Sequence, residues 1–497
     1  MNTTKKKHLK SLRDYVEVLR KTGDLKEIKR EVEANLEIGA IIRRSCEIYS
    51  PAPLFSNIKG YPGYRVLGAP LSYSSNELNR SSRVAIALGL DPSTKGPQIV
   101  QALADGAKNM RLIPPVVVEN APCQENIMLA DDVDILKFPT PMIHDGDGGR
   151  YFGTLHIMVC RTPDGSWTNW SIARVMIIED EPKKLVGILI PFQHNGIIFQ
   201  KWKDIGKPMP FAIANGVEPA ATFVGGMPLP ENLCEGDYLG GWFGEPIEVV
   251  RCKTVDLEVP ATAEIVVEGT ISTTETHPEG TMGEFHGYIN TLEKNTMPVF
   301  NISAITHRDN PILPVCSAGK PVEENHTIAG PALSAMALEE LRNAEIPVKS
   351  VYVIPESALH LMAVTVSSDW PEVTGLLPED FCRKIGHICK EFHGAYRFVR
   401  VLVTDDDIDL SDLRDIFWAW NSRCHPSKGH LTLSDEPIHP GEPLYAGHES
   451  LAAAKDDIEV LNCLLPRTEI LMKMKSTAFA DDFPKELQNR VIALWDE

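Results

Sequence analysis

The chain has 497 residues, of which 43% are hydrophobic, and its formal net charge is −19. This composition is that of a globular protein, and the length allows roughly two to four domains of about 150 residues each. The strong negative charge argues against binding to nucleic acid or to an anionic membrane surface.

Ten cysteines are scattered along the chain, and none forms a Cys-x-x-Cys pair. This spacing favours free buried thiols in a reducing compartment over a zinc site. The first thirty residues contain no apolar signal-peptide core, and the apolar stretch Leu185–Phe192 is too short to span a bilayer. We therefore expect a cytoplasmic protein.

The first part of the chain is predicted to contain helices followed by extended segments. Apolar residues recur at helical spacing from Leu9 to Leu19 and again from Leu36 to Ile42. Prolines are frequent from Pro114 to Pro141, which predicts an extended linker with short strands.

Residues 151–307 are predicted to be mostly β, with a single helix at Asn195–Ile205. Runs of β-branched and aromatic residues alternate here with turn residues. The expected strands are Phe152–Cys160, Trp170–Ile178, Leu185–Ile190, Phe211–Ala214, Ile247–Cys252, Glu264–Glu268 and Val299–Ile305. Many short strands with a rare helix favour a barrel or a sandwich.

After Pro331 the pattern changes to an alternation of helices and strands. The expected order is helix Ser334–Asn343, strand Ser350–Ile354, helix Pro378–Phe392, strand Phe398–Thr404, and a third helix capped by Ser411. This alternation predicts a separate α/β domain. A last amphipathic helix is expected at Pro484–Trp495.

Several common catalytic motifs are absent from the sequence. There is no Walker loop, no Gly-x-Gly-x-x-Gly after a strand and no His-Glu-x-x-His, and Val315 replaces the first glycine of a nucleophile elbow around Ser317. The acidic run Asp405–Asp409 lacks the glycine and final glutamate of an EF-hand, and it predicts a solvated turn. These absences argue against an NTPase, a hydrolase or a nicotinamide-dependent dehydrogenase.

Three stretches of the β region carry candidate chemistry. Thr168–Arg174 places an arginine near an asparagine and a serine, a set that suits a carboxylate or phosphate. Gln193 and His194 lie at a strand-to-helix junction, where unpaired N–H groups suit a phosphate. Glu279–Glu284 sets two carboxylates around a glycine-containing turn.

Each stretch also has an ordinary structural interpretation. Arg174 would serve equally as a solvent-facing strand residue, His194 as a cap or core residue, and residues 279–284 as a polar hairpin turn. Two carboxylates beside one arginine can, however, divide their roles. One stays ionised against the cation while the other carries a proton.

Together the three stretches resemble the core motifs of UbiD-type decarboxylases, closest to the ferulic and cinnamic acid decarboxylase branch. The combination of Asn-Trp-Ser-Ile-Ala-Arg with Glu-Gly-x-x-Gly-Glu is the most specific part, and the resemblance covers nearly the whole chain. Further matching segments are residues 35–37, 147–151, 283–288, 308–310, 326–327 and 416–419.

The resemblance implies an α+β fold in five segments. These are an N-terminal helical and extended α/β region (1–117), a split β-barrel that binds prenylated FMN (118–308), a linker with a helix (309–345), a C-terminal α/β oligomerisation domain (346–460), and a C-terminal extension with a helix (461–497). It also implies a homodimer or larger assembly, with the active site between the domains.

The resemblance further implies that metal ions tie the flavin phosphate to the protein. Asn169, His194 and Glu235 would bind a divalent metal, usually manganese, and their oxygen and imidazole ligands suit such a cation. Potassium would lie beside the phosphate, near Glu235 and the backbone oxygens of Trp170, Val224, Gly225 and Met227. The flavin itself would be lined by Ser171, Ile172, Ala173, Arg174 and Gln193.

By the same resemblance, Arg174, Glu279 and Glu284 would form the catalytic network. Loss of CO2 from an aromatic or vinylic carbon leaves a carbanion that needs an electron sink, which the cofactor supplies. Glu284 would then protonate the carbon, while Arg174, held by Glu279, would orient the substrate. Candidates for an apolar wall near the substrate carboxylate are Ile190, Phe285 and Ala329.

Two departures from the cinnamate pattern concern the substrate. Asn325 replaces a threonine, and His393 replaces a lysine that lies near the cofactor in the cinnamate enzymes, so His393 would have to take over that cofactor contact. The pair resembles pyrrole-2-carboxylate decarboxylases, and an amide and an imidazole can hydrogen-bond a polar heteroaromatic acid. Both residues also have local explanations, as a helix cap and a helix-end residue. We expect a heteroaromatic acid, with cinnamate-like and hydroxybenzoic acids as alternatives.

Two other functions compete with a decarboxylase. A flavin-binding assembly factor would keep the metal ligands but tolerate loss of the arginine and the two glutamates, all of which are present. A metal-dependent hydrolase using His194 and Glu235 would need metal but no flavin. For the decarboxylase, the expected partners are a small carboxylic acid, CO2, and a flavin prenyltransferase that supplies the cofactor, without nucleic acid or membrane.

Overall fold

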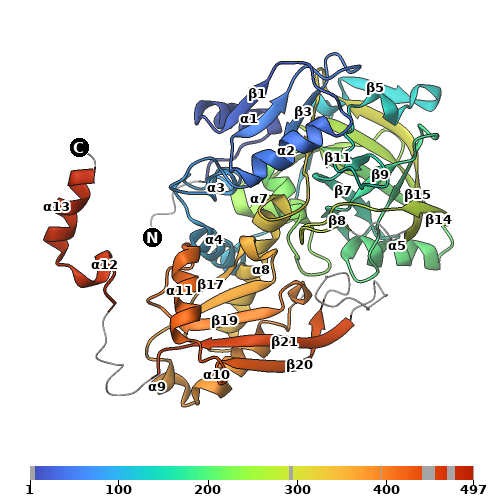
Figure 1. Cartoon of the computed structure of the whole chain (residues 1–497). Coiled ribbons are helices and arrows are strands. Elements are labelled where there is room, and N and C mark those ends of the chain that lie inside the picture. The colour runs from blue at the N-terminus through green and yellow to red at the C-terminus, as the bar shows by residue number, and fades with distance from the viewer. Residues whose placement is uncertain (1–5, 290–294, 393, 439–453, 467–475, 496–497) are drawn as a thin grey trace.

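The computed structural model describes residues 6–289, 295–392, 394–438, 454–466 and 476–495 (Figure 1). The N-terminal elements and a large curled sheet form the upper part of Figure 1, and a second sheet forms the lower part. The long helix α8 (Glu324–Asn343) lies where the two parts meet. The expected α+β fold with a curled sheet is confirmed, whereas the exact boundaries of the five segments stay predictions.

The N-terminal region combines helices with a four-stranded sheet. Helix α1 (Leu12–Lys21) begins at Ser11, whose hydroxyl accepts the N–H of Asp14, and its apolar face is buried. The sheet has the order β1 (Leu25–Ile28), β2 (Ala52–Phe55), β3 (Arg65–Gly68) and β16 (Ile312–Val315). The other helices of this region are α2 (Glu37–Glu47), α3 (Ser82–Ala87) and α4 (Gly96–Asn109).

The curled sheet is antiparallel, and two long strands, β14 (Ile265–Glu279) and β15 (Asn295–His307), form its spine. Register shifts along this pair let it bend. The order is β6 (Tyr151–Gly153), β9 (Val175–Ile177), β10 (Lys184–Gly187), β15, β14, β11 (Met209–Asn215), β7 (His156–Arg161) and β8 (Thr168–Ser171), with β5 (Asn126–Leu129) paired to β15. A small sheet of β13 (Glu258–Pro260), β12 (Glu248–Arg251) and β4 (Val116–Val117) lies beside it.

Three helices, not one, interrupt the β region. The expected helix is α5 (His194–Asp204), and the sequence-based prediction missed α6 (Pro219–Gly225) and α7 (Glu235–Phe243). The glycines of α7 disfavour a helix on propensity, yet packing requires them. A Cβ on Gly240 would lie 2.2 Å from the carbonyl oxygen of Ile113, and one on Gly236 would lie 3.2 Å from the Trp170 ring.

The C-terminal sheet has the order β17 (Val348–Val353), β18 (Leu361–Val366), β19 (Arg400–Asp405), β21 (Ala454–Cys463) and β20 (His430–Ile438). Its helices are α8, α9 (Trp370–Thr374), α10 (Pro378–Ile388) and α11 (Leu413–Arg423), followed by α12 (Phe479–Asp482) and α13 (Lys485–Trp495). Two details of the prediction were wrong. Helix α8 begins at Glu324 rather than Ser334 and contains Pro331, and α11 is capped by Asp412 rather than Ser411.

Two large hydrophobic cores and a smaller cluster around Tyr151 and Met282 hold these layers together. One runs from α1 through α8 to the C-terminal sheet and includes Leu12, Leu338 and Val403. The other fills the curled sheet around Phe211 and Phe300, whose rings meet edge to face. The first core is continuous, so α8 packs against both halves of the molecule next to the site described below.

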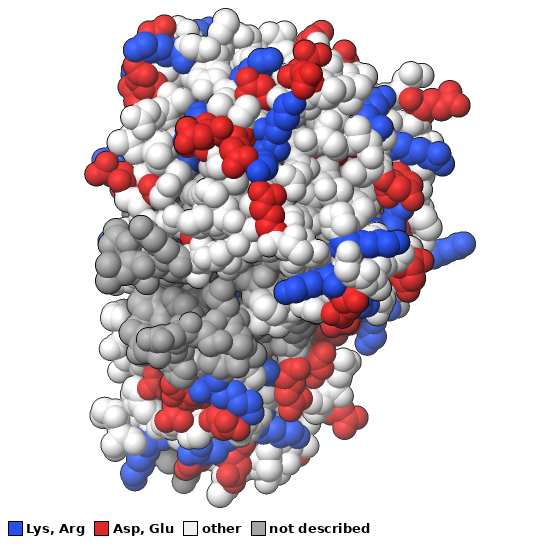
Figure 2. All heavy atoms as spheres, turned by 90° about the vertical axis from the view of Figure 1, so that its right-hand side faces the viewer, with Lys and Arg blue, Asp and Glu red and all other residues white. Residues whose placement is uncertain are grey.

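The surface in Figure 2 carries interspersed acidic and basic side chains rather than one extended patch of a single sign. Within the described ranges, no helix combines the length and apolar character needed to cross a lipid bilayer.

Candidate active site

The three predicted ligands of a divalent metal lie together. Asn169 is on β8, whereas His194 and Glu235 are the first residues of α5 and α7. His194 Nδ1 lies 3.2 Å from Asn169 Oδ1, and Glu235 Oε2 accepts the backbone N–H of Trp170 at 2.7 Å. Their exposed fractions are 1%, 8% and 2% respectively, so the cluster is buried.

The charge balance of this cluster suits a bound cation. Glu235 forms no ion pair with any cationic side chain in the part of the chain that the structure describes, and burial raises its pKa to about 8. The side-chain N–H2 group of Asn169 is also buried without a hydrogen-bond partner. A buried carboxylate is stabilised by a cation or a metal, and the oxygen and imidazole donors suit manganese. The residues present therefore fit a divalent metal.

A cavity of about 160 Å³ adjoins the cluster and lies between the curled sheet and α8. The predicted site residues that line it are Asn169, Trp170, Ser171, Ile172, Gln193, His194, Gly225, Met227, Glu235, Asn325 and Ala329. Predicted residues outside its lining are Ala173, Arg174, Ile190, Val224, Glu279, Glu284 and Phe285. The predicted residue His393 lies outside the described residues.

Of the backbone groups expected near potassium, those of Val224, Gly225 and Met227 lie at the end of α6, and that of Trp170 lies on β8. The carbonyl oxygen of Val224 accepts the N–H of Met227 at 3.0 Å, and that of Gly225 accepts the N–H of Ile172 at 3.2 Å. A Cβ on Gly225 would lie 3.5 Å from the carbonyl oxygen of Trp170. Each carbonyl oxygen has a second lone pair, so the arrangement is compatible with a monovalent cation.

Arg174 bridges the two predicted catalytic glutamates. Its Nε and Nη2 donate to the two carboxylate oxygens of Glu279 at 2.8 and 2.9 Å, and its Nη1 donates to Glu284. The hydroxyl of Tyr151 also donates to Glu279, at 2.9 Å. Burial lowers the pKa of Arg174, but the charges of Glu284 and Glu279 outweigh this effect and place it above its ordinary value.

Family comparisons cover nearly the whole chain. The Rift-related domain of 3-octaprenyl-4-hydroxybenzoate carboxy-lyase, named UbiD, matches residues 116–321. The N-terminal and C-terminal domains of the same carboxy-lyase match residues 16–103 and 326–450. The chain belongs to the UbiD family.

Full-length relatives agree with the family match, and this UbiD protein is a carboxy-lyase. It is 40% identical over 487 residues to pyrrole-2-carboxylic acid decarboxylase of Pseudomonas aeruginosa, which covers 98% of this chain and 97% of the relative. It is 35% identical over 490 residues to ferulic acid decarboxylase 1 of Saccharomyces cerevisiae, with 97% of each chain covered.

Solved structures show the same fold. The UbiD-class enzyme HmfF of Pelotomaculum thermopropionicum in complex with FMN has a TM-score of 0.79 and 25% identity, with 94% of this chain and 97% of HmfF covered. An evolved dimeric form of HmfF in complex with prFMN has a TM-score of 0.76 at 25% identity, with 94% and 99% covered.

The loop that carries Glu284 is held by the start of α8. His326 Nδ1 accepts the backbone N–H of Glu323 at 3.0 Å, so the ring proton lies on Nε2, which is 2.8 Å from the carbonyl oxygen of Phe285. Burial lowers the pKa of His326 to about 4, which keeps the ring neutral. The same helix turn therefore contacts the Glu284 loop and carries Asn325 at the cavity.

The sequence analysis missed several residues that line the cavity of this UbiD enzyme. Arg397 reaches it from the C-terminal half, at the end of the 3-10 turn Ala395–Arg397. Cys316 follows β16, and Glu324 directly precedes Asn325. The nearness of Glu324 to the recognised Asn325–His326 motif was an available signal. Arg397 and Cys316 stand in no motif that would have singled them out.

Proposed function

We propose that this carboxy-lyase uses prenylated FMN to decarboxylate a small heteroaromatic acid of the pyrrole-2-carboxylate type. The observation that carries the proposal is the arginine held on both carboxylate oxygens of Glu279 while it also contacts Glu284. The P. aeruginosa relative and the position of Asn325 in the cavity support the choice of substrate. Cinnamic, ferulic and hydroxybenzoic acids are the alternatives.

The chain would hold its cofactor through the buried cluster at Asn169, His194 and Glu235. These residues would bind manganese or a similar divalent metal, which anchors the cofactor phosphate. Potassium would lie at the backbone oxygens of Trp170, Val224, Gly225 and Met227. When bound, the prenylated flavin supplies the electron sink for the carbanion that departure of CO2 leaves. Complexes of HmfF with FMN and prFMN support the choice of a flavin cofactor.

The Arg174 network would perform the proton chemistry. A guanidinium has five N–H groups, and three of them donate to the two glutamates. The other two would orient the substrate carboxylate. Glu279, bound by Arg174 and Tyr151, would hold Arg174 in place, while Glu284, on a partly exposed loop, would carry the proton to the carbon. Ile190, Phe285 and Ala329 would form the apolar wall.

We further propose a homodimer or larger homo-oligomer assembled through the C-terminal half. Helix α11 exposes Leu413, Phe417 and Trp418, whose exposed fractions are 45%, 61% and 48%. Apolar side chains gathered on one helix suit an interface, and HmfF has an evolved dimeric form. A flavin prenyltransferase would supply the cofactor, and the ten free cysteines suit a reducing cytoplasm.

The test uses protein co-produced with a flavin prenyltransferase and loaded with manganese. CO2 release is measured with pyrrole-2-carboxylate, cinnamate and a hydroxybenzoate, together with exchange of deuterium into the product. We expect turnover of pyrrole-2-carboxylate only when flavin and metal are both present. CO2 release by the metal-loaded, flavin-free protein would contradict the role of the flavin. Hydrolysis of an ester or amide probe by that protein would support a hydrolase. Flavin-loaded protein that is inert with every acid would support an assembly factor.

A further inference from the structure

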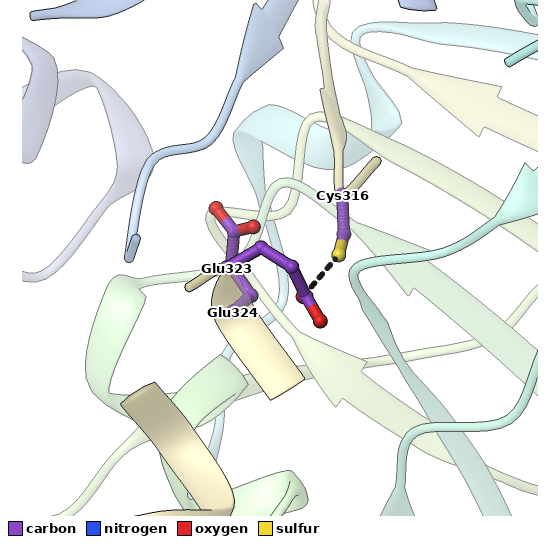
Figure 3. Close-up of side chains that lie close together, drawn as sticks. All are labelled: Cys316, Glu323 and Glu324. Carbon is purple, nitrogen blue, oxygen red and sulfur yellow. Dashed lines mark hydrogen bonds between the residues drawn. The ribbon is translucent and has the colours of Figure 1, made fainter. Parts of the chain in front are cut away.

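The first turn of α8 meets the end of β16 in a buried hydrogen-bonded cluster (Figure 3). Glu323, the N-cap of α8, is 0% exposed. Its Oε2 accepts the thiol of Cys316 at 3.0 Å and the backbone N–H of Asn325 at 2.8 Å. The turn lies against the cavity, because Cys316, Glu324 and Asn325 all line it.

The arrangement of this cluster suits hydrogen bonding better than metal binding. One ligand atom each from Cys316, Glu323 and Glu324 lie within 4.8 Å of one another. Glu323, however, already accepts several hydrogen bonds, and in Figure 3 the carboxylate of Glu324 points away from the Cys316–Glu323 pair. Glu324 instead accepts the backbone N–H of Leu71 at 3.3 Å. Within the cluster, Glu323 therefore serves as the hydrogen-bond acceptor for the first turn of α8, which carries Asn325.

The amide of Asn325 has one favourable orientation in this cluster. Its Nδ2 lies 3.2 Å from Oε1 and 3.0 Å from Oε2 of Glu323, and 3.8 Å from Cys316 Sγ. Burial raises the pKa of Glu323 to about 8, but its Oε2 already accepts the Cys316 thiol and the Asn325 backbone N–H. A flipped amide would therefore place its carbonyl oxygen against an atom that is itself an acceptor. Asn325 Oδ1 accepts no hydrogen bond from any described residue, and Asn325 lines the cavity. Asn325 therefore presents a hydrogen-bond acceptor, and not a donor, to the cavity.

We propose that Glu323 is a positioning residue that sets substrate specificity by fixing this amide. The inference rests on the proposed function and names the feature that the substrate must carry. A five-membered ring with an N–H next to its carboxylate donates to Asn325 Oδ1. A ring with oxygen or sulfur at that position sets its lone pairs against the same acceptor. Sites built to bond a polar group discriminate strongly against analogues that lack it.

The first experiment compares kcat/KM for pyrrole-2-carboxylate and furan-2-carboxylate in the flavin- and manganese-loaded enzyme. The wild type is expected to prefer pyrrole-2-carboxylate by about 10- to 100-fold, the range for one unmet buried hydrogen bond. Glu323→Gln keeps the size of the side chain but replaces one acceptor oxygen by an N–H donor, so the amide can turn. This variant is expected to lower the preference by about tenfold, mainly because its kcat/KM for pyrrole-2-carboxylate falls.

A matched control separates this effect from the general loss of a buried carboxylate. Glu268→Gln removes a buried carboxylate on β14 that accepts the backbone N–H groups of Lys253 and Thr254 and does not line the cavity. Its preference ratio is expected to stay within about twofold of the wild type, because the amide keeps its orientation. Thermal unfolding and flavin absorbance of every variant show that the fold and the loading are intact.

A double-mutant cycle shows whether Glu323 acts through Asn325. Asn325→Leu removes the acceptor and is expected to abolish most of the preference. In that background Glu323→Gln is expected to change the ratio by less than about twofold, since no amide remains to orient. An unchanged ratio in the Glu323→Gln single variant, or an equal effect in both backgrounds, overturns the inference.

Failure of the proposed substrate gives a different result. A wild type that releases CO2 from cinnamate but from neither five-membered ring acid contradicts the substrate class, and the inference about Glu323 falls with it. A wild type that prefers pyrrole-2-carboxylate, with a Glu323→Gln variant that keeps this preference, leaves the proposed function intact and overturns the role of Glu323 alone.

Discussion

Glu235 and Glu279 are both buried glutamates of this UbiD enzyme, with exposed fractions of 2% and 0%, but their surroundings differ. Glu279 lies on the end of β14 and is bound on both oxygens by Arg174 and on one by Tyr151. Glu235 starts α7 and accepts the backbone N–H of Trp170, with no cationic side chain paired to it among the described residues.

This difference separates the two halves of the active site. In the half around Glu279, the counter-ion is Arg174 of the same chain, so folding alone sets the geometry of the pair. The Glu235 half has a carboxylate, an imidazole and an amide oxygen that together suit a cation from outside the chain. In the proposed function, the groups for the proton chemistry therefore all come from the polypeptide, whereas the cofactor anchor would be completed by a metal ion.

The largest effect is expected at Glu284, the partly exposed glutamate that also pairs with Arg174. Glu284→Gln keeps the hydrogen-bonding shape beside Arg174 but cannot deliver a proton. General acid catalysis is worth about 10²–10⁴-fold, so CO2 release should fall by that factor with unchanged flavin absorbance and metal content. Turnover within about threefold of the wild type would contradict the assignment of Glu284.

The next largest effect is a difference in the free energy of unfolding between variants of the two buried glutamates, measured in metal-free and flavin-free protein. Glu279→Gln leaves Arg174 buried with one anionic partner fewer and should lower the free energy of unfolding by about 3–5 kcal/mol. Glu235→Gln breaks no ion pair and keeps an oxygen for the Trp170 N–H, so its change should stay below about 1 kcal/mol. Chemical denaturation measures both, and equal destabilisation would remove the contrast between the two sites.

The smallest effect concerns a buried polar group that no proposed ligand uses. Among the described residues, neither ring nitrogen of His156, on β7, has a hydrogen-bond partner, and burial lowers its pKa from 6.5 to about 3. Below pH 6.5 the unfolded chain binds a proton that the folded chain does not, so stability falls as the pH falls. At pH 5 this linkage costs about 2 kcal/mol.

His156→Leu should remove this cost, so the loss of unfolding free energy between pH 7 and pH 5 should shrink by about 2 kcal/mol. Met158→Leu, a neutral replacement on the same strand, should leave the pH dependence unchanged. Chemical denaturation at the two pH values makes the comparison. A wild-type pH dependence retained in His156→Leu would show that burial of a partnerless group is not the source of the acid sensitivity.

Local patterns predicted much of this fold, including α5, α10 and most strands of the curled sheet. The expected strand Trp170–Ile178 was wrong, because it is divided into β8 and β9, and Arg174 lies in the segment between them. Local patterns missed α7, because glycine lowers helix propensity. The reason for glycine at position 240 is a tertiary contact, since a Cβ there would lie 2.2 Å from the carbonyl oxygen of Ile113. They also placed the start of α8 after Pro331, because an internal proline usually ends a helix, whereas the structure keeps Pro331 within the helix.

Sequence patterns likewise predicted some residues of the candidate site and missed others. Arg174, Glu279 and Glu284 stand in specific motifs, and the structure brings these three side chains together. Arg397 reaches the cavity from a 3-10 turn more than 200 residues beyond β8. This contact depends on tertiary packing, and a single sequence carries no local signal for it.

The most direct test of the contrast between Glu235 and Glu279 is the dissociation constant of FMN measured with and without manganese. In the wild type and in Glu279→Gln, manganese should tighten FMN binding by about 5- to 150-fold, the usual range for coupled ligands. In Glu235→Gln this coupling should be lost. Coupling retained in Glu235→Gln, or lost in Glu279→Gln, would show that the cofactor anchor is not at the Asn169, His194 and Glu235 cluster.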